Sequence, residues 1–177
     1  MNLSKKILAW YDNNKRILPW RISKKSKKKH YYRILSEFML QQTQVKTVIP
    51  YFNNFVKKIP NLKALSKSKE RKILKLWEGL GYYRRAKNLH KTSKILIKKY
   101  NGQIPENFVK LKELPGIGNY TANILLALIY NQPRIGLDGN VRRVILRLFN
   151  ANAINVENFF KILFTPRGKV LANDLKP

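Results

Sequence analysis

The stretch Leu114-Pro115-Gly116-Ile117-Gly118 decides the fold, because it lies between two helical patterns, residues 108–111 and 120–130. Its two glycines permit a tight turn and a close approach of the backbone to a partner. The next helix begins at once, so its free N–H groups and its dipole favour an anion there. Such a hairpin can hold a DNA phosphate without reading sequence, and a plain connector between helices is the alternative.

Helical periodicity also dominates the sequence on both sides of this hairpin. Apolar residues recur every three or four positions, no segment alternates as a strand does, and no internal repeat occurs. The pattern predicts a long helix over residues 32–48 that is ended by Pro50, and helices over residues 86–100 and 138–148. We therefore expect an all-α fold class.

The charge of the chain indicates a polyanionic partner. Lys and Arg number 37 against 9 Asp and Glu, which gives a formal net charge of +28 and favours nucleic acid. A genomic bias toward lysine explains the same excess, and the two explanations are compatible.

The lack of cysteine and of long apolar runs limits which metal sites, membrane attachments and compartments we expect. The chain has no cysteine, which excludes disulfides and any cysteine-ligated metal within it. Residues 1–11 lack the apolar core of a signal peptide, and the longest apolar run, residues 124–130, is too short to span a bilayer. We expect a cytoplasmic monomer with no membrane attachment and no metal.

Asp138 is the first acidic candidate, within Leu137-Asp138-Gly139-Asn140-Val141-Arg142-Arg143. It opens a predicted helix, so one role for it is an N-cap worth about 1 kcal/mol. A carboxylate at a helix N-terminus also suits the stabilisation of a nearby cation. The pattern leaves both roles open.

Glu37 is the second acidic candidate, among the apolar residues Ile34, Phe38 and Leu40. Periodicity favours a solvated face, because Glu37, Gln41 and Gln44 recur at helical spacing. The functional alternative needs apolar surroundings that raise the pKa of the carboxyl group, so that it donates a proton near neutrality. Two carboxyl groups in different environments are what cleavage of a glycosidic bond requires.

Four linked motifs resemble those of MutY-type adenine DNA glycosylases. They are residues 36–52, beginning Ser36-Glu37-Phe38, residues 76–86, residues 114–121 and residues 137–144. The resemblance implies a two-lobed helix-hairpin-helix glycosylase fold. A six-helix barrel would span residues 22–133, with the hairpin region at about 107–130. A second helical lobe, truncated, would combine residues 1–21 with residues 134–177.

The resemblance also implies roles for single residues. Glu37 would protonate adenine, Asp138 would stabilise the oxocarbenium ion, and Tyr120 and Asn140 would tune and orient the site. Gln42 and Tyr82 would enter the duplex and support extrusion of the base, although core packing with Tyr83 is an alternative for Tyr82. The hairpin would bind DNA through the following residues: Leu114, Pro115, Gly116, Ile117, Gly118 and Thr121.

The expected substrate is double-stranded DNA with adenine opposite 8-oxoguanine or guanine. Tyr120 stands where endonuclease III-type relatives carry a Schiff-base lysine, so we expect a glycosylase without lyase activity. The family's [4Fe–4S] cluster is held by four cysteines, which this sequence lacks, and we expect neither the cluster nor the family's Nudix-like region in this chain. The alternatives are a DNA-binding fragment without catalysis and an endonuclease III-type pyrimidine glycosylase with lyase activity.

Overall fold

The computed structural model describes residues 3–22, 26 and 28–149 of the chain. These residues form helices and no strand, which confirms the all-α class. The helices are α1 (Leu3–Asn14), α2 (Lys29–Leu40), α3 (Val45–Lys58), α4 (Leu62–Lys67), α5 (Glu70–Trp77), α6 (Arg84–Tyr100), α7 (Phe108–Lys112), α8 (Asn119–Tyr130) and α9 (Gly139–Phe149). No described helix is both long and apolar enough to cross a membrane.

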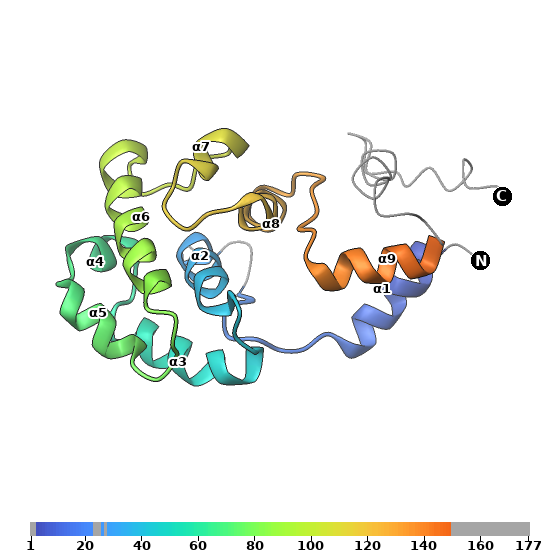
Figure 1. The fold of residues 1–177 in the computed structure, drawn as a ribbon, viewed down its shortest axis with the longest axis horizontal. Coiled ribbons are helices and arrows are strands. Elements are labelled where there is room, and N and C mark those ends of the chain that lie inside the picture. Colours follow the sequence, from blue (N-terminus) through green and yellow to red (C-terminus); the bar gives the residue numbers. More distant parts are fainter. Residues whose placement is uncertain (1–2, 23–25, 27, 150–177) are drawn as a thin grey trace.

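Helix α2 is the central element of the larger part of the molecule. It contacts α3, α6 and α8, so these helices surround it (Figure 1). Its buried face is mostly apolar, and Phe38 belongs to the same core as the fully buried aromatic residues Phe52, Phe55 and Trp77. The rings of Phe55 and Trp77 meet edge to face with centroids 6.1 Å apart. This packing holds the C-terminal end of α2, which carries Glu37, in a fixed place.

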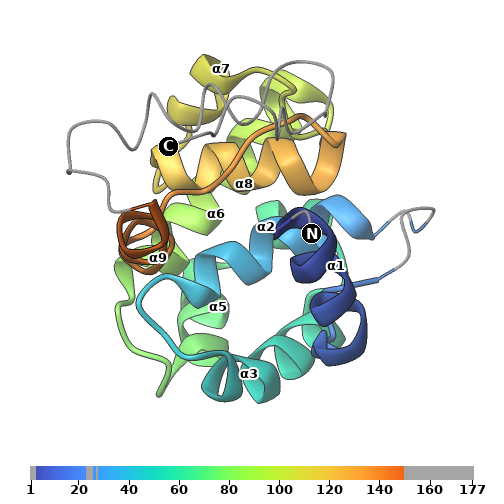
Figure 2. The same ribbon diagram turned by 90° about the vertical axis from the view of Figure 1, so that its right-hand side faces the viewer.

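Helices α1 and α9 are both at the opposite end of the molecule from α4 and α5 (Figure 1). The turned view separates α1 from α9, so the two helices do not lie side by side (Figure 2). The apolar side chains Ile7, Leu8 and Trp10 of α1 are exposed. The division into lobes at residues 22 and 133 stays a prediction, and residues 150–177 of the second lobe lie outside the described residues.

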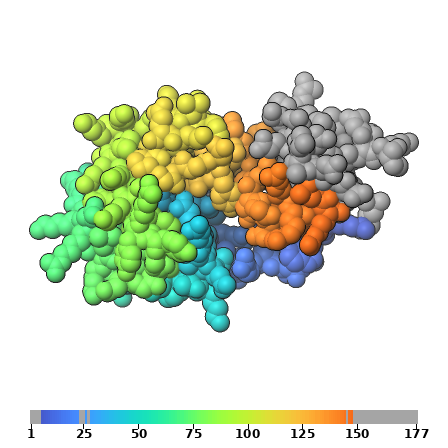
Figure 3. Space-filling view, in the orientation of Figure 1, coloured from blue at the N-terminus to red at the C-terminus, as the bar shows by residue number. Residues whose placement is uncertain are grey.

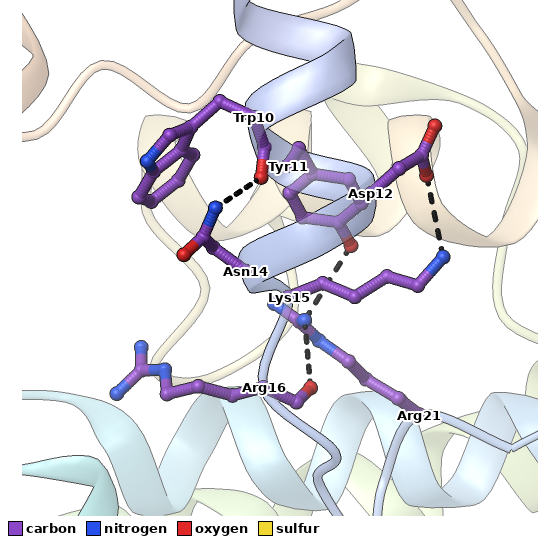
Figure 4. A network of polar contacts seen from close by, with 7 residues as sticks. All are labelled: Trp10, Tyr11, Asp12, Asn14, Lys15, Arg16 and Arg21. Carbon is purple, nitrogen blue, oxygen red and sulfur yellow. Dashed lines mark hydrogen bonds and ion pairs between the residues drawn. The ribbon is translucent and has the colours of Figure 1, made fainter.

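Polar contacts fix the segment that follows α1 (Figure 4). The Lys15 ammonium lies 3.2 Å from a carboxylate oxygen of Asp12. The Arg21 guanidinium donates to the Tyr11 hydroxyl at 3.4 Å and to the Arg16 carbonyl at 3.2 Å. These bonds direct the chain from α1 back toward the larger part, where Leu18 and Trp20 are buried.

The long helix predicted over residues 32–48 and ended by Pro50 is wrong. Helix α2 ends at Leu40, a turn containing Gln42 at φ 56° follows, and α3 begins at Val45. Pro50 lies inside α3, where its ring removes the N–H that would bond to the carbonyl of Lys46. Since Lys46 is exposed, water can satisfy that carbonyl, and the helix continues.

Candidate active site

The hairpin of residues 114–118 joins α7 to α8 and needs glycine at Gly116. Gly116 has φ 81°, and a Cβ there would lie 2.8 Å from a ring carbon of Phe38 and 2.9 Å from the Cβ of Asn88. Two side-chain bonds brace the turn, from Gln41 Nε2 to the Gly116 carbonyl at 3.1 Å and from Thr92 Oγ1 to the Pro115 carbonyl at 2.9 Å. The hairpin is therefore packed directly against α2 and α6.

Gly118 meets a different requirement, because its φ of −93° is open to any residue. No described atom would lie within 4 Å of a Cβ placed there, and no described side chain caps the first turn of α8. The first N–H groups of α8 therefore have no side-chain cap among the described residues and stand at the positive end of the helix dipole. The side chains of Leu114, Ile117 and Thr121 are buried, which leaves the backbone as the part of the hairpin that can bind an anion.

A groove with a volume of about 850 Å³ opens beside the start of α8. The surface is hollowed between the part built from α2 to α8 and the part carrying α9 (Figure 3). Seven of the predicted site residues line it together, five predicted for the chemistry or for entry into the duplex and two from the hairpin region: Glu37, Gln42, Tyr82, Tyr120 and Asp138, with Gly118 and Thr121. Among the remaining predicted residues, Asn140 and residues 114–117 do not line this groove.

The Glu37 carboxyl group is largely withdrawn from water near the end of α2. Burial raises its pKa from 4.5 to about 7, and the Arg33 guanidinium opposes this shift only in part. The interpretation of a solvated face shared with Gln41 and Gln44 is wrong, because α2 ends at Leu40 and the two glutamines belong to the turn beyond it. Glu37 is thus a carboxylic acid that keeps its proton close to neutral pH.

Asp138 caps α9, and its role in stabilising a cation stays a prediction. Its Oδ1 accepts a hydrogen bond of 2.7 Å from the Val141 N–H, in the third position of α9, which is an N-cap contact. Its side chain also lines the groove. Asn140 is exposed on the first turn of α9, and its Oδ1 accepts from the Arg143 guanidinium.

The Tyr120 phenol interacts electrostatically with the carboxyl groups of both Glu37 and Asp138. Burial raises the pKa of its phenol, and the charges of Glu37 and then Asp138 raise that pKa further. Gly136 permits this arrangement, because a Cβ there would lie 2.7 Å from the Tyr120 ring and 2.4 Å from Ile124. The sequence does not single out Gly136, because a glycine in the loop before Asp138 gives no sign of its contact with Tyr120.

Gln42 and Tyr82 line the groove and protrude into solvent. Gln42 is exposed at φ 56°, and Tyr82 is 61% exposed at φ 48°. Core packing of Tyr82 with Tyr83 is therefore wrong, since Tyr83 is exposed as well. Both backbone conformations are rare for residues other than glycine, and each costs about 1–3 kcal/mol.

A second cavity of about 550 Å³ shares Glu37 and Leu40 with the groove. The sequence interpretation missed its wall, which has an aromatic and cationic character: Tyr11, Lys15, Arg16, Ile17, Leu18, Trp20, Arg21, Arg33, Val45 and Leu128. The segment Leu18-Pro19-Trp20-Arg21 was recognisable only as a break after the first helix. Its approach to Glu37 is a tertiary contact that no local pattern reveals.

The residues of this chain do not fit a [4Fe–4S] cluster, which requires four thiolate ligands. The sequence contains no cysteine, and no group of three or more His, Asp or Glu within the described part of the chain could hold a metal ion.

These features define a class of helical protein in which a hairpin presents free backbone amides beside a groove with two carboxyl groups. The chain belongs to the HhH-GPD superfamily of base excision DNA repair proteins, whose family model matches residues 35–165. It is 47% identical over 159 residues to an adenine DNA glycosylase of Buchnera aphidicola (strain Bp), covering 89% of this chain and 44% of that protein. It is 39% identical over 147 residues to the mouse adenine DNA glycosylase, covering 80% of this chain and 28% of that protein.

Solved structures share the fold. A thermostable thymine-DNA glycosylase matches with a TM-score of 0.75 and 24% identity, over 89% of this chain and 73% of that one. An endonuclease III trapped as a covalent DNA intermediate matches with a TM-score of 0.70 and 21% identity, over 96% and 82%. The chain spans less than half the length of the curated glycosylases named above.

Proposed function

We propose that this chain performs the chemistry of an adenine DNA glycosylase. It would hydrolyse the N-glycosidic bond of adenine opposite 8-oxoguanine or guanine in double-stranded DNA, as a monomer in the cytoplasm. The single observation that carries the proposal is the Glu37 carboxyl group, whose pKa of about 7 lets it act as an acid in a groove that also holds Asp138. The names of the relatives support adenine as the base.

The first step would be protonation of the base by Glu37. A proton passes from the carboxyl group to N7 of adenine, and the bond between C1′ and N9 breaks with its electron pair going to the base. Neutral adenine is then the leaving group, and Glu37 remains as a carboxylate. The second cavity offers space for the base beyond Glu37, while the sugar stays on the side of Asp138.

The second step would be capture of the sugar cation by water. The Asp138 carboxylate faces the positive charge that develops at C1′, and the Glu37 carboxylate accepts a proton from the attacking water. Water oxygen then bonds to C1′, which leaves an abasic site and restores the acid form of Glu37. Tyr120 would tune Asp138, and Asn140 would orient the residues at the start of α9.

DNA binding would use the backbone of the hairpin and the two protruding residues. The free N–H groups after Gly118 would bind one phosphate, and the net charge of +28 would strengthen binding to the polyanion. Gln42 and Tyr82 would enter the stack and fill the space that the extruded adenine leaves.

The test is adenine release under single-turnover conditions from a duplex with adenine opposite 8-oxoguanine or guanine. We expect release by the wild-type chain, loss of at least 100-fold in Glu37→Gln, and an unchanged rate in the matched surface control Glu70→Gln. Glu70 is 47% exposed and lies 3.8 Å from Lys87. Equal rates in wild type and Glu37→Gln would refute the acid role. Salt-sensitive DNA binding with no base release would favour the binding fragment, and a borohydride-trapped adduct in good yield would indicate lyase chemistry.

A further inference from the structure

Arg85 has an environment that its place in the sequence does not suggest. It is 6% exposed, and its guanidinium group lies between the end of α2 and the loop that follows α5. Five backbone carbonyls accept from its two terminal nitrogens: Nη1 donates to Phe38 at 3.4 Å, to Met39 at 2.8 Å and to Gln41, and Nη2 donates to Leu80 at 3.3 Å and to Gly81 at 3.1 Å. One side chain therefore links two segments that are about forty residues apart.

Two of these carbonyls immediately precede the residues that protrude into the groove. The carbonyl of Gln41 shares a peptide plane with the nitrogen of Gln42, and the carbonyl of Gly81 shares one with the nitrogen of Tyr82. The φ angles of Gln42 and Tyr82, 56° and 48°, are rotations relative to those two planes. Arg85 thus holds both peptides that set the left-handed conformations, each through a different arm of one planar group.

The same guanidinium group also contacts the protruding aromatic side chain. Its central carbon lies 5.3 Å from the ring centroid of Tyr82 and 5.7 Å from that of Trp77. The Trp77 indole N–H donates to the Gly81 carbonyl at 3.1 Å, so that carbonyl has two donors. The position of the Tyr82 ring is therefore coupled to Arg85 through both its backbone and its face.

The bonds from Arg85 to α2 hold the end of the helix that carries Glu37. The carbonyls of Phe38 and Met39 belong to the last turn of α2, where a helix leaves its carbonyls without helical partners. A cation there satisfies them and suits the negative end of the dipole. Glu37 is the residue before Phe38, so the same group that sets the protruding residues also fixes the helix end that carries the acid.

We propose that Arg85 is a positioning residue that holds Gln42 and Tyr82 in the conformation needed to extrude the base, in register with Glu37. This inference rests on the proposed function. Arginine is required because its fork reaches both peptide planes at once, whereas the single ammonium of a lysine cannot.

The experiment uses the full chain and a duplex with 2-aminopurine, whose fluorescence rises when it leaves the stack, opposite guanine. Arg85→Met removes the donors, Arg85→Lys keeps the charge, and Lys91→Met is the control because Lys91 is an exposed cation on the same helix. We expect both Arg85 variants to bind the duplex within threefold of wild type but to unstack the base at least tenfold more slowly, while Lys91→Met matches wild type.

A double-mutant cycle separates positioning from a loss of fold. Tyr82→Ala should slow unstacking by itself, and Arg85→Met combined with Tyr82→Ala should be no slower than the slower single variant within twofold. If the effects of the two substitutions multiply in the double variant, the proposal is wrong. Unstacking at the wild-type rate in Arg85→Met, or loss of helical circular dichroism in both Arg85 variants, would also overturn it. A wild-type chain that unstacks 2-aminopurine yet releases no adenine would refute the proposed chemistry and leave the role of Arg85 standing. A wild-type chain that binds without unstacking would refute the extrusion role together with this one.

Discussion

Replacing Glu37 by glutamine should make the protein more stable at alkaline pH while removing its activity. Folding raises the pKa of the Glu37 carboxyl group from 4.5 to about 7, chiefly through burial. At 1.36 kcal/mol for each tenfold change in the protonation equilibrium, this difference amounts to about 3 kcal/mol. Glutamine has nearly the same shape and cannot ionise, so it does not carry that penalty.

The sign of the effect follows from which state holds the proton. Below pH 4.5 the Glu37 carboxyl group is protonated in both states, so it adds no pH dependence. Between pH 4.5 and about 7 the unfolded chain releases this proton while the folded chain keeps it, so the free energy of unfolding falls as the pH rises. Only this contribution of Glu37 to the free energy of unfolding, present at pH 4, is lost as the pH rises through 7.

The measurement is urea unfolding followed by helical circular dichroism from pH 4 to pH 8. Subtracting wild type from Glu37→Gln cancels the titration of all other groups, and the difference should grow by about 3 kcal/mol across this range. The exposed control Glu70→Gln should give a difference that stays within about 0.5 kcal/mol. A Glu37→Gln difference that is independent of pH, or that falls as the pH rises, would show that Glu37 is an ordinary solvated carboxylate.

Three further outcomes follow from the geometry of the groove. Gly116→Ala should lower the free energy of unfolding by about 1–3 kcal/mol, because Gly116 has a left-handed φ of 81° and lies against α2. Gly118→Ala should leave stability unchanged and weaken DNA binding. Equal stabilities in the two variants would contradict this prediction. Asp138→Ser should keep the cap of α9 and near wild-type stability while losing adenine release. Asp138→Ala should lose adenine release and, in addition, about 1 kcal/mol of the free energy of unfolding. Release by Asp138→Ser at the wild-type rate would show that Asp138 takes no part in the chemistry. Tyr120→Lys should yield a borohydride-trapped DNA adduct that wild type does not form, provided that the amine reaches C1′ from the groove; an adduct yield equal to that of wild type would place position 120 away from the sugar.

The sequence predicts most of the fold because the helices are marked by local signals. The helix over residues 86–100 ends where expected, since Asn101 and Gly102 adopt the left-handed conformations of a C-cap. The hairpin is equally visible, because the close packing of Gly116 against α2 allows only glycine. In both places a single residue type satisfies a backbone requirement.

The end of α2 could not be predicted, because no local breaker marks it. Neither glycine nor proline occurs between Leu40 and Val45, and the break depends on the left-handed Gln42. That conformation is supported by bonds from Arg85, more than forty positions away in the sequence. The same error placed Glu37 on a solvated face, since the apparent periodicity continued across a turn that tertiary contacts create.

The cavity beyond Glu37 was missed for a similar reason. Its wall combines the segment after α1 with the start of α3 and the end of α8, and these segments are distant in the sequence. Trp20 and Arg21 carry no motif that ties them to an acid. A pattern within one helix can indicate an apolar face, but it cannot indicate which distant residues will share a cavity with it.

The acid role of Glu37 is tested most directly by the pH dependence of adenine release by the wild-type chain under single-turnover conditions. We expect the rate to fall tenfold per pH unit above a midpoint near pH 7, because the base can leave only while Glu37 holds its proton. A rate that stays constant up to pH 9 would contradict this role, since the Glu37 carboxyl group would then not supply the proton.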